Sequence, residues 1–299
     1  MVSDILELIG GTPVIEIKSV GLENGCRLFA KLEYFNPTGS HKDRIALYMV
    51  RGAIKRFGLK PGNYIVEASS GNTAISVTFV ARRLGLKPVI VIPKSTSKAK
   101  VKILEFLGAE IIFGDEDPAS ESYYIRIAER VARERNTVFL NQYANPDNAL
   151  AHYETTAREI WEQMNGDIDA FVMGVGTGGT ITGVGRFLKE RKRDVKIVAV
   201  TPRGSKLAGG VGEDRIEGLL HKDVPPLLDK TVIDRVIEVS YSEALEMALH
   251  LAKEEGILAG ISSGANIAGA IKVSRELPRN SKIVTIIADS IFRYVEEIQ

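Results

Sequence analysis

Short runs of β-branched residues alternate along this sequence with longer amphipathic stretches. The runs at residues 64–68, 88–93 and 170–174 are each followed by a segment with apolar residues at helical spacing, and a further run lies at residues 196–200. This alternation is typical of βαβ units built around a mainly parallel sheet. It predicts an α/β fold.

The pattern falls into two series, which meet near residues 143–148. We therefore expect two three-layer α/β domains with mainly parallel sheets. Residues 1–146 would form a smaller, mobile domain and residues 147–299 a larger one, and the stretch before about residue 35 can pack on the larger domain. Further strands are expected at residues 110–113, 138–141, 236–239 and 282–288, and a helix at residues 149–164.

Charge and cysteine content exclude several classes of protein. Lys and Arg number 39 against 38 Asp and Glu, so the net charge of +1 gives no sign of a nucleic-acid or membrane partner. No apolar run approaches the ~20 residues that cross a bilayer, and the N-terminus does not resemble a signal peptide. Cys26 is the only cysteine and the four histidines are widely spaced, so neither a disulfide nor a metal site is expected. We expect a cytoplasmic protein.

Three turns are rich in glycine and hydroxyl residues, and each opens a predicted helix. They read Ser-Ser-Gly-Asn-Thr at residues 69–73, Gly-Thr-Gly-Gly-Thr at 176–180 and Gly-Ile-Ser-Ser-Gly at 260–264. Open α/β sheets bind ligands at such turns. In residues 176–180, glycines let the backbone approach an anion, and the helix start supplies unpaired N–H groups. This turn predicts a phosphate site made of neutral donors, with a plain tight connection as the alternative.

Two other motifs match these turns formally. Residues 174–179 fit G-x-G-x-x-G, but the next strand ends in Thr201 and Pro202 instead of the acid that binds a dinucleotide ribose. Residues 260–264 fit G-x-S-x-G, but the last histidine, His250, precedes the serine, whereas an α/β hydrolase needs it afterwards. A dehydrogenase and a hydrolase are both disfavoured.

Lys42 stands at the start of a predicted helix, directly after the turn at residues 36–41. Taken alone, a lysine in this position is usually a solvated charge. A lysine able to form a Schiff base, together with a phosphate cradle, is what pyridoxal phosphate requires.

The chain resembles the cysteine synthase branch of the fold-type II (tryptophan synthase β-like) pyridoxal-phosphate enzymes. That branch includes O-acetylserine and O-phosphoserine sulfhydrylases and the cystathionine β-synthase core. The resemblance runs in order from Gly-Gly-Thr-Pro at residues 10–13, through Lys-Leu-Glu at 31–33 and the lysine turn at 36–44, to Ile-Trp-Glu-Gln at 160–163 and on to Asp289. It implies a homodimer that replaces the β-substituent of an activated L-serine with sulfide, through aminoacrylate, to give L-cysteine.

The same resemblance implies roles for individual residues. Lys42 would be the catalytic Schiff-base lysine, Asn72 would bond the ring hydroxyl oxygen of the cofactor, and Ser262 would face the pyridine nitrogen. The residues that would hold the cofactor phosphate are Gly176, Thr177, Gly178, Gly179 and Thr180. Those that would bind the substrate carboxylate are Ser69, Ser70, Gly71, Asn72, Thr73 and Gln142. Arg215, in the irregular segment 201–230, is a candidate to bind a phosphate leaving group, with a solvated surface charge as the alternative.

Four positions depart from the family pattern. Ala74 replaces a glycine, His41 replaces an apolar residue, Thr96 replaces a methionine, and residues 290–294 read Ser-Ile-Phe-Arg-Tyr where Ser-Gly-Glu-Arg-Tyr is usual. No catalytic group is lost, but the leaving group and the sulfur donor stay open. The alternatives are a serine-using cystathionine β-synthase-like enzyme, a serine/threonine dehydratase, or a pyridoxal-phosphate-binding protein that has lost catalysis. Intact Lys42, Asn72 and Ser262 argue against the last.

Overall fold

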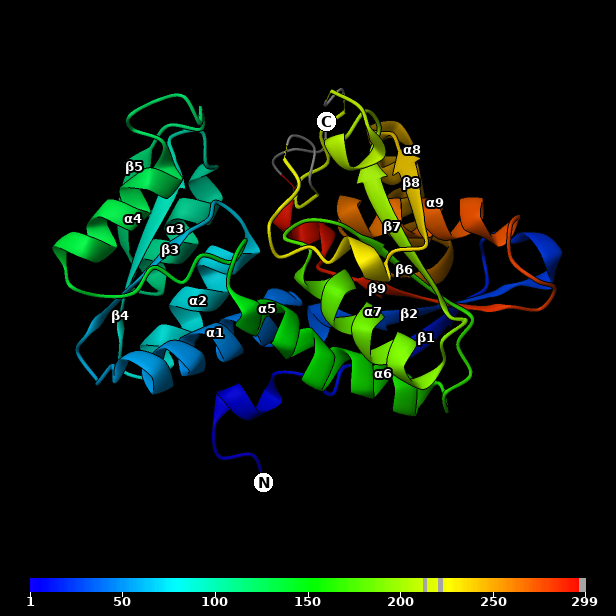
Figure 1. Ribbon diagram of the computed structural model, residues 1–299, viewed down its shortest axis with the longest axis horizontal. Coiled ribbons are helices and arrows are strands. Elements are labelled where there is room, and N and C mark those ends of the chain that lie inside the picture. Colours follow the sequence, from blue (N-terminus) through cyan, green and yellow to red (C-terminus); the bar gives the residue numbers. More distant parts are fainter. Residues whose placement is uncertain (212–213, 220–222, 296–299) are drawn as a thin grey trace. The chain divides into compact units, whose positions relative to one another are not determined.

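Apolar strands and the helices between them form two α/β units in the computed structural model (Figure 1). The structure describes residues 1–211, 214–219 and 223–295. Met1–Ile9 and Lys42–Asn148 form the first unit, and Gly10–His41 and Ala149–Gln299 form the second. All strand pairings but one are parallel, which confirms the predicted α/β fold with mainly parallel sheets. In the part of the chain that the structure describes, no helix has the length and apolar character to cross a bilayer.

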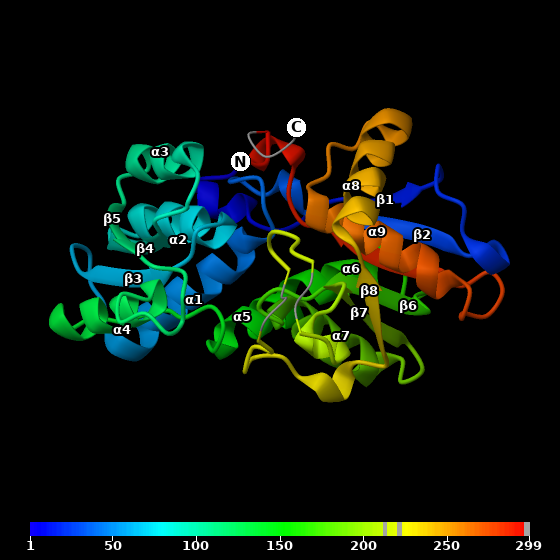
Figure 2. The same ribbon diagram turned by 90° about the horizontal axis from the view of Figure 1, so that it is seen from above.

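The first unit is built on a three-stranded parallel sheet in the order β3-β4-β5. Its strands are β3 (Tyr64–Ala68), β4 (Lys87–Pro93) and β5 (Glu110–Gly114). Its helices are α1 (Lys42–Phe57), α2 (Asn72–Arg83), α3 (Lys98–Phe106) and α4 (Tyr124–Glu134). Alternate residues of β3 and β4, such as Val66 and Val89, pack against α4, while α2 and α3 lie on the opposite side of the sheet (Figure 2). The buried faces explain why these strands are almost continuously apolar.

The second unit is built on a six-stranded sheet in the order β1-β2-β9-β6-β7-β8, in which only β1 is antiparallel. Its strands are β1 (Val14–Ile17), β2 (Arg27–Leu32), β6 (Ala170–Gly174), β7 (Lys196–Pro202), β8 (Arg235–Val239) and β9 (Lys282–Ile287). Its helices are α6 (Ala157–Gln163), α7 (Gly179–Arg191), α8 (Tyr241–His250) and α9 (Ile261–Ser274), and α5 (Pro146–Ala151) spans the division between the units.

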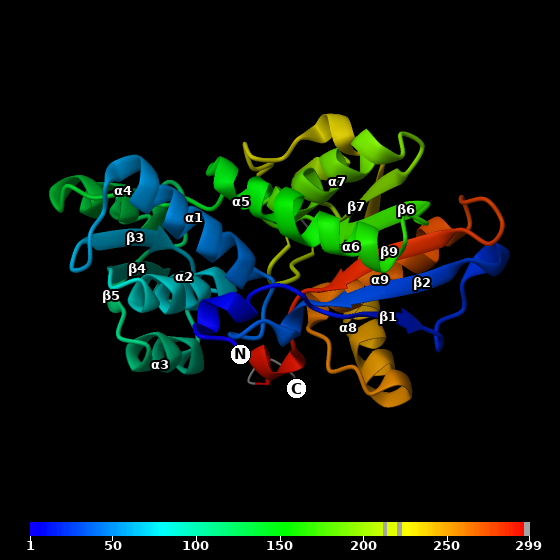
Figure 3. The same cartoon turned by 90° about the horizontal axis from the view of Figure 1, so that it is seen from below.

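Side-chain alternation along the strands assigns these helices to two faces. Val172 and Val198 lie in the apolar cluster with α9, whereas Phe171 and Ile197 lie in the cluster with α6 and α7. Figure 3 shows α6 and α7 on one side of the sheet and α8 and α9 on the other. The second unit is therefore a three-layer structure, with β9 and β6 at its centre.

The sequence prediction was wrong at residues 138–141, which do not form a strand. Phe139 makes only an isolated bridge to Val66, because Asn141 adopts a left-handed backbone with φ of 50° and ends the extended run. Strands β1 and β2 were not predicted. The charge of Lys31 obscures the pattern of β2, although the side chain is fully buried and paired with Glu159 at 2.8 Å.

The predicted helix at residues 149–164 is present, but with a π-helical turn, His152–Thr156, between α5 and α6. Such π-turns often occur at functional sites. This one brings His152 to the start of α7, as described below.

Asn266 joins β6 to β9 where the two strands separate. The strands pair directly only at Ala170 and Phe171. Beyond that point the side chain of Asn266 accepts a hydrogen bond from Gly174 N at 2.7 Å and donates one to Ile286 O at 2.8 Å. Asn266 therefore helps to hold the end of β6 against β9, together with Thr285 on β9, whose Oγ1 donates to Val172 O at 2.7 Å.

Replacing Asn266 with leucine should lower the free energy of unfolding by roughly 2–4 kcal/mol, because a buried N–H and a buried C=O each lose a partner. Urea denaturation would measure this as a lower midpoint with an unchanged slope. A loss under about 0.5 kcal/mol would mean that the backbone groups find other partners.

Candidate active site

The turn between β6 and α7 has room only for glycine at two positions. A Cβ atom at Gly176 would lie 2.3 Å from Gly218 O, and one at Gly178 would lie 2.8 Å from the Cβ of Leu228. Gly178 has φ of 84° and is the N-cap residue of α7, and as a glycine it has no side chain to cap the N–H groups at the start of this helix. Thr177 and Thr180 are buried beside it. The turn thus presents helix-start N–H groups and two hydroxyl side chains, a combination suited to an anion.

His152 positions the hydroxyl of Thr180. Its Nε2 lies 3.1 Å from Thr180 Oγ1, and its Nδ1 lies 2.9 Å from Thr156 Oγ1. The ring is fully buried and stands 5.8 Å from that of His41, between centroids. Sequence reasoning missed His152. The only signal for it is a histidine on a predicted helix, four residues before a threonine.

Ser262 lies at the same edge of the six-stranded sheet as the glycine turn. Helix α9 runs back toward the start of β9, so its first turn stands at the carboxyl end of that strand. Ser263 Oγ accepts from Ala288 N at 2.9 Å, and Gly260 N donates to Asp289 O at 3.0 Å. Since β9 and β6 are parallel neighbours, their carboxyl ends share one edge, where buried Ser262 and the turn both lie.

Residues 38–41, which precede Lys42, are attached to that edge as well. His41 N donates to Ala288 O at 2.9 Å, and Ser40 forms a bridge with Asp289. Lys42 is the first residue of α1, as the sequence predicted.

The turn after β3 brings together residues that are distant in the sequence. Thr73 Oγ1 donates to Gln142 Oε1 at 2.6 Å, and Ser69 Oγ accepts from Gly71 N at 3.2 Å. Asn72 opens α2 after Gly71, which caps the helix without a side chain. The structure therefore places Gln142 beside the 69–73 turn.

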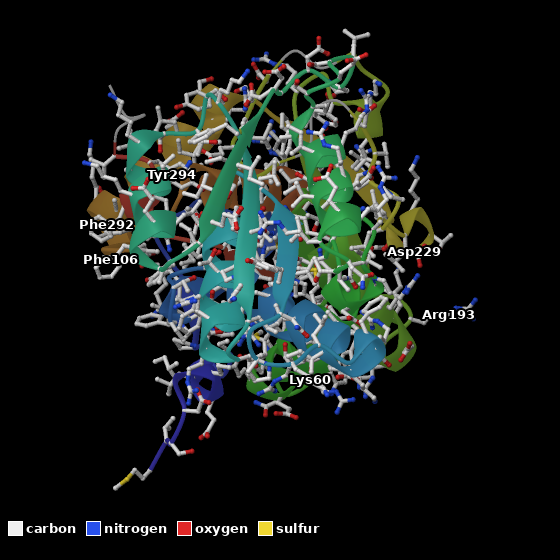
Figure 4. The ribbon with its side chains drawn as sticks, turned by 90° about the vertical axis from the view of Figure 1, so that its left-hand side faces the viewer. Lys60, Phe106, Arg193, Asp229, Phe292 and Tyr294 are labelled. Atoms are coloured by element: carbon white, nitrogen blue, oxygen red, sulfur yellow. The ribbon has the colours of Figure 1, made fainter. Side chains whose placement is uncertain are left out.

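The departures from the family pattern at residues 74 and 290–294 are accommodated locally. Ala74 is fully buried in α2. Phe292 is 72% exposed, whereas Tyr294 is buried and donates to Asp289 Oδ2 at 2.6 Å (Figure 4). The change at residue 292 thus faces solvent, and Tyr294, the last residue of the motif, is held by its hydrogen bond to Asp289.

Arg215 is exposed, in the described segment 214–219. Three residues later, the carbonyl of Gly218 approaches Gly176. This segment therefore passes next to the glycine turn. Cys26 is buried in the apolar cluster that includes α9, and burial raises the pKa of its thiol, which is typical of an unreactive cysteine.

Comparison with known proteins identifies the class. The family model described as "Pyridoxal-phosphate dependent enzyme" matches residues 5–289, and the chain belongs to that family. Within it, the chain is 41% identical to a cysteine synthase of Staphylococcus aureus (strain Mu50), over 98% of this chain and 96% of that protein. It is 42% identical to a cystathionine beta-synthase of Apis mellifera, over 98% of this chain but only 60% of the bee protein.

Solved structures agree with this assignment. A cysteine synthase from Entamoeba histolytica superposes with a TM-score of 0.92 at 35% identity, covering 100% of this chain and 92% of that one. An O-ureido-L-serine synthase superposes with a TM-score of 0.93 at 35% identity, covering 99% and 94%. The family resemblance, the fold-type II architecture and pyridoxal phosphate as the cofactor are thereby confirmed.

The residues present fit this cofactor. The glycine turn at Gly176 and Gly178 leaves no space for side chains but leaves helix-start N–H groups for a phosphate. A hydroxyl, Ser262, lies at the same sheet edge and can accept or donate a hydrogen bond at a ring nitrogen.

Proposed function

We propose that this chain forms L-cysteine from an activated L-serine and sulfide by replacing the β-substituent. The observation that carries the proposal is that the glycine turn and Ser262 share one sheet edge, in a chain similar over 98% of its length to a cysteine synthase. Lys42 is the catalytic residue in this proposal. Bound pyridoxal phosphate supplies an electron sink for the α-carbon of the amino acid.

Residues of the chain bind the cofactor and move the proton in this proposal. Gly176, Thr177, Gly178, Gly179 and Thr180 hold the phosphate through neutral donors. Asn72 bonds the ring hydroxyl oxygen. The hydroxyl of Ser262 meets the ring nitrogen without enforcing its protonation, as a carboxylate would. This favours prompt loss of the β-substituent over racemisation or transamination. The amine of Lys42 takes the α-proton.

The turn after β3 binds the α-carboxylate of the substrate in this proposal. Ser69, Ser70, Gly71, Asn72 and Thr73 provide hydroxyls, an amide and the N–H groups at the start of α2. The hydrogen bond between Thr73 and Gln142 supports this arrangement, because it fixes both side chains before the substrate arrives.

Product analysis of the cofactor-loaded protein tests the proposed function. O-acetylserine with sulfide should give L-cysteine. Cystathionine formed only from serine and homocysteine, or a keto acid formed from serine alone, would indicate the two alternative enzymes. Cofactor binding without turnover of any of these substrates would indicate a protein that has lost catalysis.

The proposal also names an activated substrate, O-phosphoserine, and a residue to bind it. We propose that Arg215 pairs with the phosphate of O-phosphoserine, and its support is the approach of Gly218 to the glycine turn. Arg215→Ala should lower kcat/KM for O-phosphoserine roughly tenfold or more, since a charge-assisted contact contributes ~1.5–3 kcal/mol. Turnover of O-acetylserine should hardly change. Equal losses on both substrates, or no turnover of O-phosphoserine by the unmodified enzyme, would contradict this role.

We also propose that the protein is a homodimer and is located in the cytoplasm. The resemblance to a family of homodimers supports the first part. An amino-acid substrate and a sulfur nucleophile are the expected partners.

A further inference from the structure

The edge of β3 that does not face β4 pairs with residues 138–140, and this backbone pairing stops next to the 69–73 turn. Val66 N donates to Val138 O, and Leu140 N donates to Val66 O, both at 2.9 Å. In a parallel ladder the next bonds would join Ala68 N to Leu140 O and Gln142 N to Ala68 O. Asn141 turns the chain with φ of 50°, so this continuation is lost and two buried N–H groups need other acceptors.

The carboxyl group of Glu67 accepts from both of these N–H groups. Ala68 N donates to Glu67 Oε1 at 3.0 Å, and the N–H of Gln142 also bonds the carboxyl group. Glu67 therefore joins the last residue of β3 to Gln142. Gln142 in turn accepts from Thr73. Contacts thus run without a break from Glu67, through Gln142, to the turn that we assign to the substrate carboxylate.

Glu67 is fully buried and has no positively charged partner among the described residues, and its Oε2 has no hydrogen-bond partner there. The titratable side chains around it are Tyr124 on α4 and Tyr143 after Gln142. Burial is the main cause that raises the pKa of both tyrosines. For Tyr124 the neighbouring Tyr143 comes next and the charge of Glu67 last, whereas for Tyr143 the charge of Glu67 comes second, and both tyrosines stay neutral. Burial raises the pKa of Glu67 itself to about 8, against the opposing effect of the two N–H groups. A proton therefore neutralises Glu67 at neutral pH.

We propose that Glu67 is a positioning residue that holds Gln142 and Thr73 in the geometry that binds the substrate carboxylate, and that loss of its proton weakens this binding at alkaline pH. The proposal rests on the proposed function for the assignment of the 69–73 turn. Its physical basis is that an ionised Glu67 would place a buried negative charge close to an incoming carboxylate, where water screens it poorly.

The test is calorimetric titration of the cofactor-loaded protein with L-alanine, which has a carboxylate and an amine but no β-leaving group. Between about pH 7 and about pH 9 the dissociation constant should rise roughly tenfold more in the unmodified protein than in Glu67→Gln, since ionisation of one group at about pH 8 governs the difference. Glutamine keeps an acceptor for both N–H groups but cannot ionise. Any titration of the alanine amine is common to both proteins and cancels.

Two further variants separate positioning from general stability. Glu110→Gln, an exposed glutamate on β5, should keep the pH dependence of the unmodified protein. Glu67→Leu removes the acceptor and should weaken alanine binding at least tenfold at both pH values. If Glu67→Leu does not fold, the comparison of the unmodified protein with Glu67→Gln still tests the proposal.

The same pH dependence in the unmodified protein and in Glu67→Gln would overturn the proposal. Sulfide has no carboxylate, so its KM should hardly respond to this substitution. A change in the KM for sulfide in Glu67→Gln as large as the change in alanine binding would also overturn the proposal. Alanine binding needs no turnover. A protein that binds alanine with the expected pH dependence but makes no cysteine would therefore contradict the proposed function and leave this inference standing.

Discussion

Lys42→Ala should lower kcat for cysteine formation by a factor of roughly 10³ or more and change the visible absorbance of the cofactor-loaded protein. In the proposed mechanism, the variant loses both the group that binds the cofactor covalently and the base that takes the α-proton. Steady-state assays with O-acetylserine and sulfide, together with absorption spectra, would measure both effects.

Lys55→Ala is the matched control, because Lys55 is exposed in the last turn of the same helix α1. It should behave as the unmodified enzyme does. Normal turnover and an unaltered spectrum in Lys42→Ala would remove Lys42 from the mechanism.

Gly176→Ala should raise the dissociation constant for pyridoxal phosphate by about a hundredfold. The new Cβ would lie 2.3 Å from Gly218 O, a backbone atom, so the turn must shift and its donors lose their alignment. Loss of even one or two charge-assisted contacts, at ~1.5–3 kcal/mol each, accounts for that factor. Equilibrium dialysis of the apoprotein against the cofactor would measure it.

Gly21→Ala provides the control for this substitution. Gly21 is in the same unit, its φ is not in the left-handed region, and a Cβ there would meet nothing within 4 Å. Its cofactor affinity should not change. If Gly176→Ala folds normally and also keeps its affinity, the phosphate lies elsewhere.

Local sequence was sufficient for much of the architecture and for the separate motifs. The runs at β3, β4, β6 and β7 were predicted nearly to their ends, because a strand buried on both faces needs consecutive apolar residues. The turns at residues 69–73, 176–180 and 260–264 were predicted to open helices, because glycine and small hydroxyl residues favour helix starts. Those are properties of neighbouring residues, so the sequence itself determines them.

Tertiary structure decided the rest, since each remaining feature depends on a partner far along the chain. Lys31 can be buried in β2 because Glu159, 128 residues later, neutralises it. His152 becomes part of the site only because a π-turn directs it to Thr180. The strand expected at residues 138–141 ends in a bridge because Asn141 turns away and Glu67 takes over the next two hydrogen bonds. No periodicity or turn motif encodes such pairings, because they satisfy buried polar groups that meet only when the chain has folded.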